Sequence, residues 1–163
     1  MKQVWPVIIG LLLLIAGPVP AGPAVFSTWE GLETDKLASI WLIQRFISPG
    51  ANIVFHPKGT PPANGVAFDT PYSTISRKFN QSTFESMLSY FRLEDPVLEK
   101  IGRLIHDIEI NVWEKKKYRK TVEMQVFFID LFSDSQENGH AVKRANAYFD
   151  RLYDDLAGPM PLD

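Results

Sequence analysis

Apolar residues recur at intervals of three and four positions along much of the chain after its first 34 residues. That spacing gathers them on one face of a helix. The predicted helices span residues 35–47, 82–91, 96–108 and 142–156. Asp35 is placed to cap the first of them, and Ser82 and Glu85 form a capping box at the second. Asp95 followed by proline predicts the start of the third.

Shorter segments follow other patterns. Residues 51–56 and 66–68 are short and apolar, with Ile53 and Phe55 on one face, as is typical of strands. Residues 121–132 fit either a strand or a helix, and we predict a helix because the segment is long and lacks turn residues. The whole pattern predicts a mainly helical α+β fold, with five or six helices and two short strands near the start of the mature domain.

The first residues have the composition of a targeting signal. Lys2 precedes the apolar run Val4–Ala16, which is shorter than the ~20 residues of a membrane-spanning helix and is followed by prolines. We therefore expect a signal peptide cleaved after Ala21 or Ala24, and a periplasmic or secreted protein without a membrane span; an uncleaved anchor is the alternative. The predicted organisation is a signal peptide at residues 1–21, an N-terminal arm at 22–34 and a single domain at 35–158.

Composition narrows the possible chemistry. The chain of 163 residues has no cysteine, which excludes disulfides, thiolate ligands and thiol nucleophiles. Its 17 basic and 19 acidic side chains give a formal charge of −2, so we expect no nucleic-acid partner. The sequence contains no glycine-rich phosphate loop and no GxSxG or HExxH motif. The sequence therefore carries only a weak signal for an enzyme.

Imidazole and carboxylate side chains suggest a metal site. His106 and Glu109 lie about 60° apart on one helix face, with Gly102 between them. A glycine inside a helix costs ~1 kcal/mol relative to alanine, which suggests that something approaches the backbone there. The candidate ligands for a divalent metal ion are His106, Glu109, Asp107, Asp69 and Glu85. The alternatives are a solvated helix face, a turn at Asp69 and the capping box at Glu85.

Basic and hydroxyl side chains suggest an anion site instead. Arg77 lies in a polar loop just before a helix that begins near Ser82 and Thr83. The free N–H groups of a helix N-terminus favour anions, and a guanidinium can bind an oxyanion through two hydrogen bonds. The candidate oxyanion ligands are Arg45, Arg77, Ser82 and Thr83. A solvated loop with a capping box is the alternative.

Several of these segments resemble, in the same order, the bacterial chromate-resistance exported protein family, which also occurs as the carboxy-terminal domain of chromate-sensing regulators. The matching segments are LASIWLIQRFI at 37–47, AFD at 67–69, STFE at 82–85, LEDP at 93–96, IHDIE at 105–109 and YFDRLY at 148–153. The resemblance covers about residues 35–156. It implies a role in bacterial chromate or metal stress, with a metal ion or a chromate-like oxyanion as the partner.

The chain departs from this family at three places. Ser39 and Ser82 stand where many members carry cysteines, and Arg77 lies near the position of a loop histidine. Thiol chemistry is therefore excluded here. The residues that the resemblance carries over are Arg45, Asp69, Glu85, His106, Asp107 and Glu109.

Two other functions stay open from the sequence. One is a hydrolase in which Glu85 or Asp69 works with His106 as an acid–base pair. The other is an interaction protein without a small-molecule site. Its protein partner would contact aromatic residues at 127–132 and at Tyr148, Phe149 and Tyr153.

Overall fold

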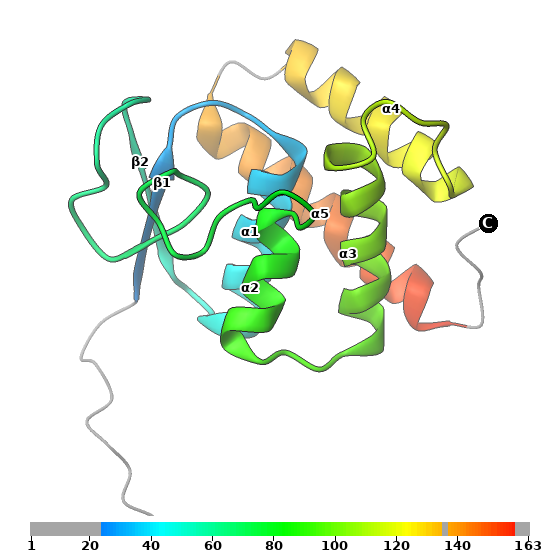
Figure 1. Ribbon diagram of the computed structural model, residues 1–163, viewed down its shortest axis with the longest axis horizontal. Coiled ribbons are helices and arrows are strands. Elements are labelled where there is room, and N and C mark those ends of the chain that lie inside the picture. Colours follow the sequence, from blue (N-terminus) through cyan, green and yellow to red (C-terminus); the bar gives the residue numbers. More distant parts are fainter. Residues whose placement is uncertain (1–23, 135–136, 159–163) are drawn as a thin grey trace, which may run out of the picture.

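The computed structural model describes residues 24–134 and 137–158 (Figure 1). The predicted signal peptide at residues 1–21 lies outside this part. The described strands are β1 (Val25–Trp29), β2 (Asn52–His56) and β3 (Val66–Ala67). The helices are α1 (Thr34–Leu42), α2 (Thr83–Phe91), α3 (Pro96–Glu109), α4 (Arg119–Asp134) and α5 (Asn138–Ala157), with a π-helical turn at Ile43–Ile47 after α1. The predicted mainly helical α+β fold is confirmed.

The three strands form one parallel sheet in the order β2-β1-β3. Its central strand, β1, lies in the segment that the sequence indicated as an N-terminal arm, so the structure adds a third strand to the two expected. Phe26 pairs with both Ile53 of β2 and Val66 of β3. Because parallel strands need a crossover, α1 connects β1 to β2. Figure 1 shows the sheet on one side of the helices, with α3 and α4 on the other.

Helix α1 is the centre of the core. All nine of its residues are buried, and it packs against α2, α3 and α5. Trp41 stacks on Phe84 of α2 and Phe149 of α5, and its indole N–H donates to Asp150 Oδ1 at 2.8 Å. The core therefore surrounds α1 with other helices. At its N-terminal end, α1 carries the charged residues Asp35 and Lys36.

Helices α2 and α3 begin where their sequence signals indicate. Ser82 Oγ accepts from the Glu85 N–H while the Glu85 carboxylate accepts from the Ser82 N–H, which confirms the capping box. Asp95 Oδ1 accepts from the N–H groups of Val97 and Leu98, which confirms the cap of α3. Residues 121–132 lie within α4, so the helix prediction is confirmed there too. Within the two described ranges, no helix is both long enough and apolar enough to span a membrane.

Gly102 lies where α3 packs against α2. A β-carbon at this position would lie 3.5 Å from Glu85 Cγ and 3.7 Å from side-chain carbons of Leu88 and Phe84. These are ordinary contact distances, so the site has room for alanine. Helix α2 thus comes close to the backbone of Gly102 but leaves enough space for the methyl group of an alanine.

Replacing Gly102 by alanine is therefore expected to raise the free energy of unfolding by about 0.5–1 kcal/mol, because alanine loses less backbone entropy in a helix. Urea denaturation would measure the change. The matched control is Gly50→Ala, where φ is +80° and a side chain is strained, so stability should fall. An unchanged or lower stability for Gly102→Ala would contradict the prediction.

Candidate functional site

Charged residues from separate parts of the chain meet at the N-terminal end of α1. We call this group the carboxylate cluster. It comprises Asp35, Lys36, Asp69, Arg77, Thr83 and Glu109. The residues come from the start of α1, the segment after β3, the loop before α2, the start of α2 and the end of α3. The fold thus brings together side chains that lie up to 74 positions apart, from Asp35 to Glu109.

Asp35 is the innermost member and is 0% exposed. The sequence suggested that Asp35 caps its own helix, and this prediction is wrong. Helix α1 begins after Glu33, and no side chain caps it. Instead the Asp35 carboxylate accepts from the backbone N–H groups of Thr83 and Phe84, at 2.7 and 2.9 Å. It therefore occupies the anion-favouring N-terminus of α2 from a neighbouring helix.

Asp69 follows β3 with a positive φ of 52°, which is uncommon for a residue other than glycine. Its carboxylate accepts from Thr83 Oγ1 at 2.8 Å and lies 3.6 Å from Lys36 Nζ. The Lys36 side chain is only 3% exposed, and its ammonium also donates to the Gly31 carbonyl. Strained backbone held by several partners is typical of functional sites.

Arg77 bridges two carboxylates. Its Nη2 lies 2.5 Å from Glu109 Oε2 and 3.7 Å from Asp35 Oδ2. The Arg77 side chain is 39% exposed, whereas that of Asp35 is fully buried. Arg77 therefore covers the cluster from the solvent side. A pocket of about 370 Å³ opens beside it, with Asp69 and Glu33 also in its wall.

Two carboxyl groups of the cluster, Asp35 and Asp69, are poorly stabilised as anions. Burial, followed by the nearby Asp69, raises the pKa of Asp35 to about 7, and the two backbone hydrogen bonds offset this only in part. Burial also raises the pKa of Asp69, despite the hydrogen bond from Thr83 and the charge of Lys36. An additional proton or cation near these groups would therefore be favourable.

His106 and Glu85, two of the proposed metal ligands, lie together beside the cluster. His106 Nδ1 is 3.2 and 3.1 Å from the two oxygens of the Glu85 carboxylate. This meets the distance requirement of the hydrolase alternative. The same carboxylate, however, accepts from the Ser82 N–H at 2.8 Å, so Glu85 already has a structural role in the capping box.

Asp107 contributes to neither group. It is 1% exposed, and it accepts from Asn111 Nδ2 and from the Lys117 backbone N–H, both at 2.7 Å. Burial raises the pKa of Asp107, but these hydrogen bonds outweigh it and the net shift is downward. Asp107 therefore ties the loop before α4 to α3. Among the described residues, no three His, Asp or Glu side chains are arranged to hold a metal ion.

The four proposed oxyanion ligands do not form one group. Arg45 makes a two-pronged ion pair with Asp150, from its Nε and Nη2, both at 2.9 Å. Ser82 and Thr83 lie at the N-terminus of α2, which the Asp35 carboxylate fills. Only Arg77 and Thr83 belong to the carboxylate cluster.

Sequence reasoning missed Asp35 and Lys36 as members of the site. A signal was present, because every residue of α1 after these two is apolar except Ser39. Charged residues that open an entirely buried helix need partners elsewhere in the fold. The partners could not be named from the sequence, since they follow from how α2 and α3 pack on α1.

A family model described as the C-terminal domain of ChrB matches residues 26–156. The chain belongs to this family. The chromate-resistance family that the sequence resembled is thereby confirmed, and the match includes every residue of the carboxylate cluster.

A curated relative of this ChrB-type domain is Protein ChrB of Cupriavidus metallidurans, which is 31% identical over 87 residues. The aligned region covers 52% of this chain and 27% of the relative, so the chain spans about a quarter of the relative's length. No solved structure matches the chain.

Proposed function

We propose that this protein is an exported accessory domain of the bacterial chromate or metal stress response, and that it binds a hard metal cation at the carboxylate cluster. Membership of the chromate-resistance family supports the cellular role. The observation that carries the ligand class is the fully buried Asp35 carboxyl, which lies beside two further acids. A cation there would relieve the cost of ionising buried carboxyl groups.

The balance of charge favours a cation over an oxyanion. Asp35, Asp69 and Glu109 are joined by Glu33, which lies 3.9 Å from Lys36. Among the residues that the structure describes, only Lys36 and Arg77 form ion pairs with these four acids. A doubly charged chromate would meet more negative than positive groups, and the helix terminus that would attract it is already filled.

The ligand atoms define the kind of cation. Carboxylate and hydroxyl oxygens are available at the cluster, and the chain has no thiolate to offer. Oxygen ligands suit hard cations such as Mg²⁺, Mn²⁺ or trivalent chromium, the reduced form of chromate.

Arg77 would control access to the ligands. Its guanidinium lies between Asp35 and Glu109, the position that a competing cation would take. Because the side chain is partly exposed and lies on a loop, it can leave without unpacking the core. In this proposal, displacement of Arg77 allows Asp35, Asp69 and Glu109 to close on the ion.

Calorimetric titration of the protein with Mn²⁺ tests the proposal. We expect saturable binding that weakens at least tenfold in Glu109→Gln, which removes a charged ligand, and strengthens in Arg77→Gln, which removes the competing cation. The matched control is Glu99→Gln, an exposed acid on the same helix, which should bind as the unchanged protein does. Absence of Mn²⁺ binding, or saturable binding of chromate in its place, would overturn the proposal.

Export forms the other part of the proposal. It is supported by the charged start, short apolar run and small residues of residues 1–21. The family match begins after this segment, at residue 26. A site built from carboxylates without thiols would remain functional in an oxidising compartment.

A further inference from the structure

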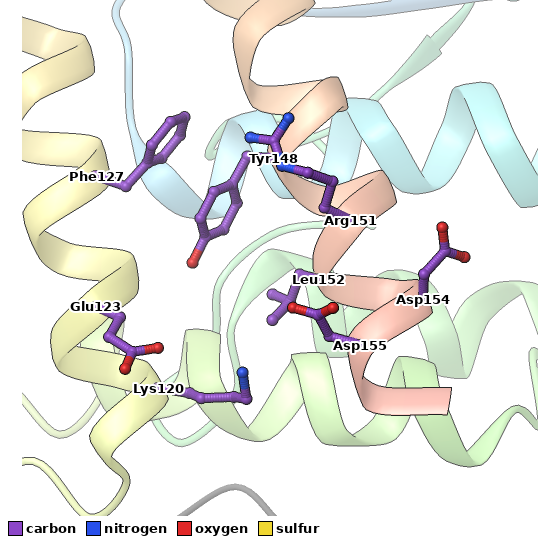
Figure 2. Close-up of a pocket in the computed structure, with 8 residues that line it drawn as sticks. All are labelled: Lys120, Glu123, Phe127, Tyr148, Arg151, Leu152, Asp154 and Asp155. Atoms are coloured by element: carbon purple, nitrogen blue, oxygen red, sulfur yellow. The ribbon is translucent and has the colours of Figure 1, made fainter. Parts of the chain in front are cut away.

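A second pocket lies between α4 and α5, away from the carboxylate cluster. It has a volume of about 490 Å³ (Figure 2). Phe127, Tyr148 and Leu152 supply its apolar wall, and the Phe127 and Tyr148 rings stack with centroids 4.2 Å apart. Charged residues surround this wall. They are Lys120, Glu123, Arg151, Asp154 and Asp155.

Lys120 distinguishes this pocket from an ordinary surface groove. It is only 7% exposed, yet within the described part of the chain its ammonium makes no hydrogen bond or ion pair. Lysine is rarely buried to this extent without a partner. Figure 2 shows its ammonium pointing into the space between the two helices. The nearby Glu123 is instead paired with Arg119.

Tyr148 directs a second donor into the same space (Figure 2). Burial, followed by the charge of Glu123, raises the pKa of Tyr148 to about 12. Its hydroxyl therefore remains protonated at physiological pH and can donate a hydrogen bond. Lys120 and Tyr148 together present two donors next to an apolar surface.

We propose that this pocket binds a small organic monocarboxylate with a hydrophobic body. The carboxylate accepts from the Lys120 ammonium and the Tyr148 hydroxyl, while the body packs on Leu152 and the edge of the Tyr148 ring. Such a ligand supplies the partner that the Lys120 ammonium lacks at the pocket.

The acids around the pocket restrict the ligand further. Glu123, Asp154 and Asp155 outnumber the two cations of the lining, Lys120 and Arg151, so a dianion such as sulfate or chromate would be repelled more strongly than a monoanion. A single negative charge placed against Lys120, with apolar contacts elsewhere, fits the lining better. This site and its ligand class are independent of the cation proposed for the carboxylate cluster.

The inference can be tested by adding benzoate to the full chain at constant ionic strength and recording its NMR spectrum at each step. We expect saturable shifts of resonances from α4 and α5. Lys120→Met should weaken binding at least tenfold, because it keeps the apolar stem and removes the charge. Tyr148→Phe keeps the stacked ring and should weaken binding by a smaller factor. Lys143→Met, at an exposed lysine of α5, is the control and should leave the affinity unchanged.

Three results would overturn the inference. The first is the absence of saturable benzoate binding to the unchanged protein. The second is wild-type affinity in both Lys120→Met and Tyr148→Phe. The third is equal binding of sulfate, which would show that charge alone attracts the ligand. If Lys120→Met fails to fold, as judged by its NMR spectrum, the conservative Tyr148→Phe variant decides the question.

Discussion

Replacing Trp41 by alanine is expected to lower the free energy of unfolding by about 3–5 kcal/mol, the range seen when a large buried aromatic side chain is removed. Trp41 is 1% exposed. Besides its stacking on Phe84 and Phe149, its ring contacts Phe46 and Tyr153, with centroids 5.3 and 6.1 Å away. The substitution would therefore open a cavity where α1, α2 and α5 meet.

Urea denaturation of purified variants would measure this loss. Trp113→Ala is the matched control, because the same change is made at a side chain that is 97% exposed. We expect its stability to stay within about 0.5 kcal/mol of the unchanged protein. A loss below about 1 kcal/mol for Trp41→Ala would show that Trp41 is not central to the core.

The helices were predictable from the sequence because their signals are local. Apolar spacing, the capping box at Ser82 and the Asp95 cap each depend on a few neighbouring residues, and the structure contains all of them. Strand β1 was not predicted because its sequence, VFSTW, does not alternate between apolar and polar residues. Ser27 and Thr28 are buried with Phe26, since β1 is the central strand of the sheet. Only the pairing with β2 and β3 explains that burial.

The site was predictable only in part, because its contacts join residues that are far apart in the sequence. Helical spacing placed His106 and Glu109 on one face of α3, but the two have different partners, Glu85 and Arg77. Asp35 appeared to be a local cap because its sequence position fits one. Its actual partners lie 48 and 49 positions away, a distance that no local pattern can specify.

The structure also changes the set of aromatic residues that a protein partner could contact. Phe128 and Phe149 are buried in the core, so neither forms an outer surface. Phe127 stacks on Tyr148 at the pocket between α4 and α5. The exposed apolar residues of α4 are Val122, Val126 and Ile129.

The free energy of unfolding is expected to fall as the pH rises from about 4 to 7. The pKa of Asp35 is about 7 in the folded protein, against an ordinary value of 3.8. Between these values the folded state holds a proton that the unfolded state has released, so a rise in pH favours unfolding. Asp35 can contribute a slope of up to about 1.4 kcal/mol per pH unit, and the raised pKa of Asp69 acts in the same direction.

Other carboxyl groups act outside this window. Hydrogen bonds and ion pairing lower the pKa values of Asp95, Asp107 and Asp150 below the ordinary value. Their stabilisation is complete above about pH 5 and is lost as the pH falls further. The free energy of unfolding should therefore be greatest near pH 4–5. Its decline above that range reports on Asp35 and Asp69 of the carboxylate cluster.

Urea denaturation at several pH values, with Asp35→Asn beside the unchanged protein, would measure the effect. The variant cannot ionise at this position, so its stability should depend less on pH between 5 and 7. Asp154→Asn, at an exposed acid of α5, should retain the original slope. Parallel slopes for Asp35→Asn and the unchanged protein would contradict the assignment. If Mn²⁺ binds at the cluster, it should also flatten the slope of the unchanged protein, because the ion favours the ionised form of Asp35.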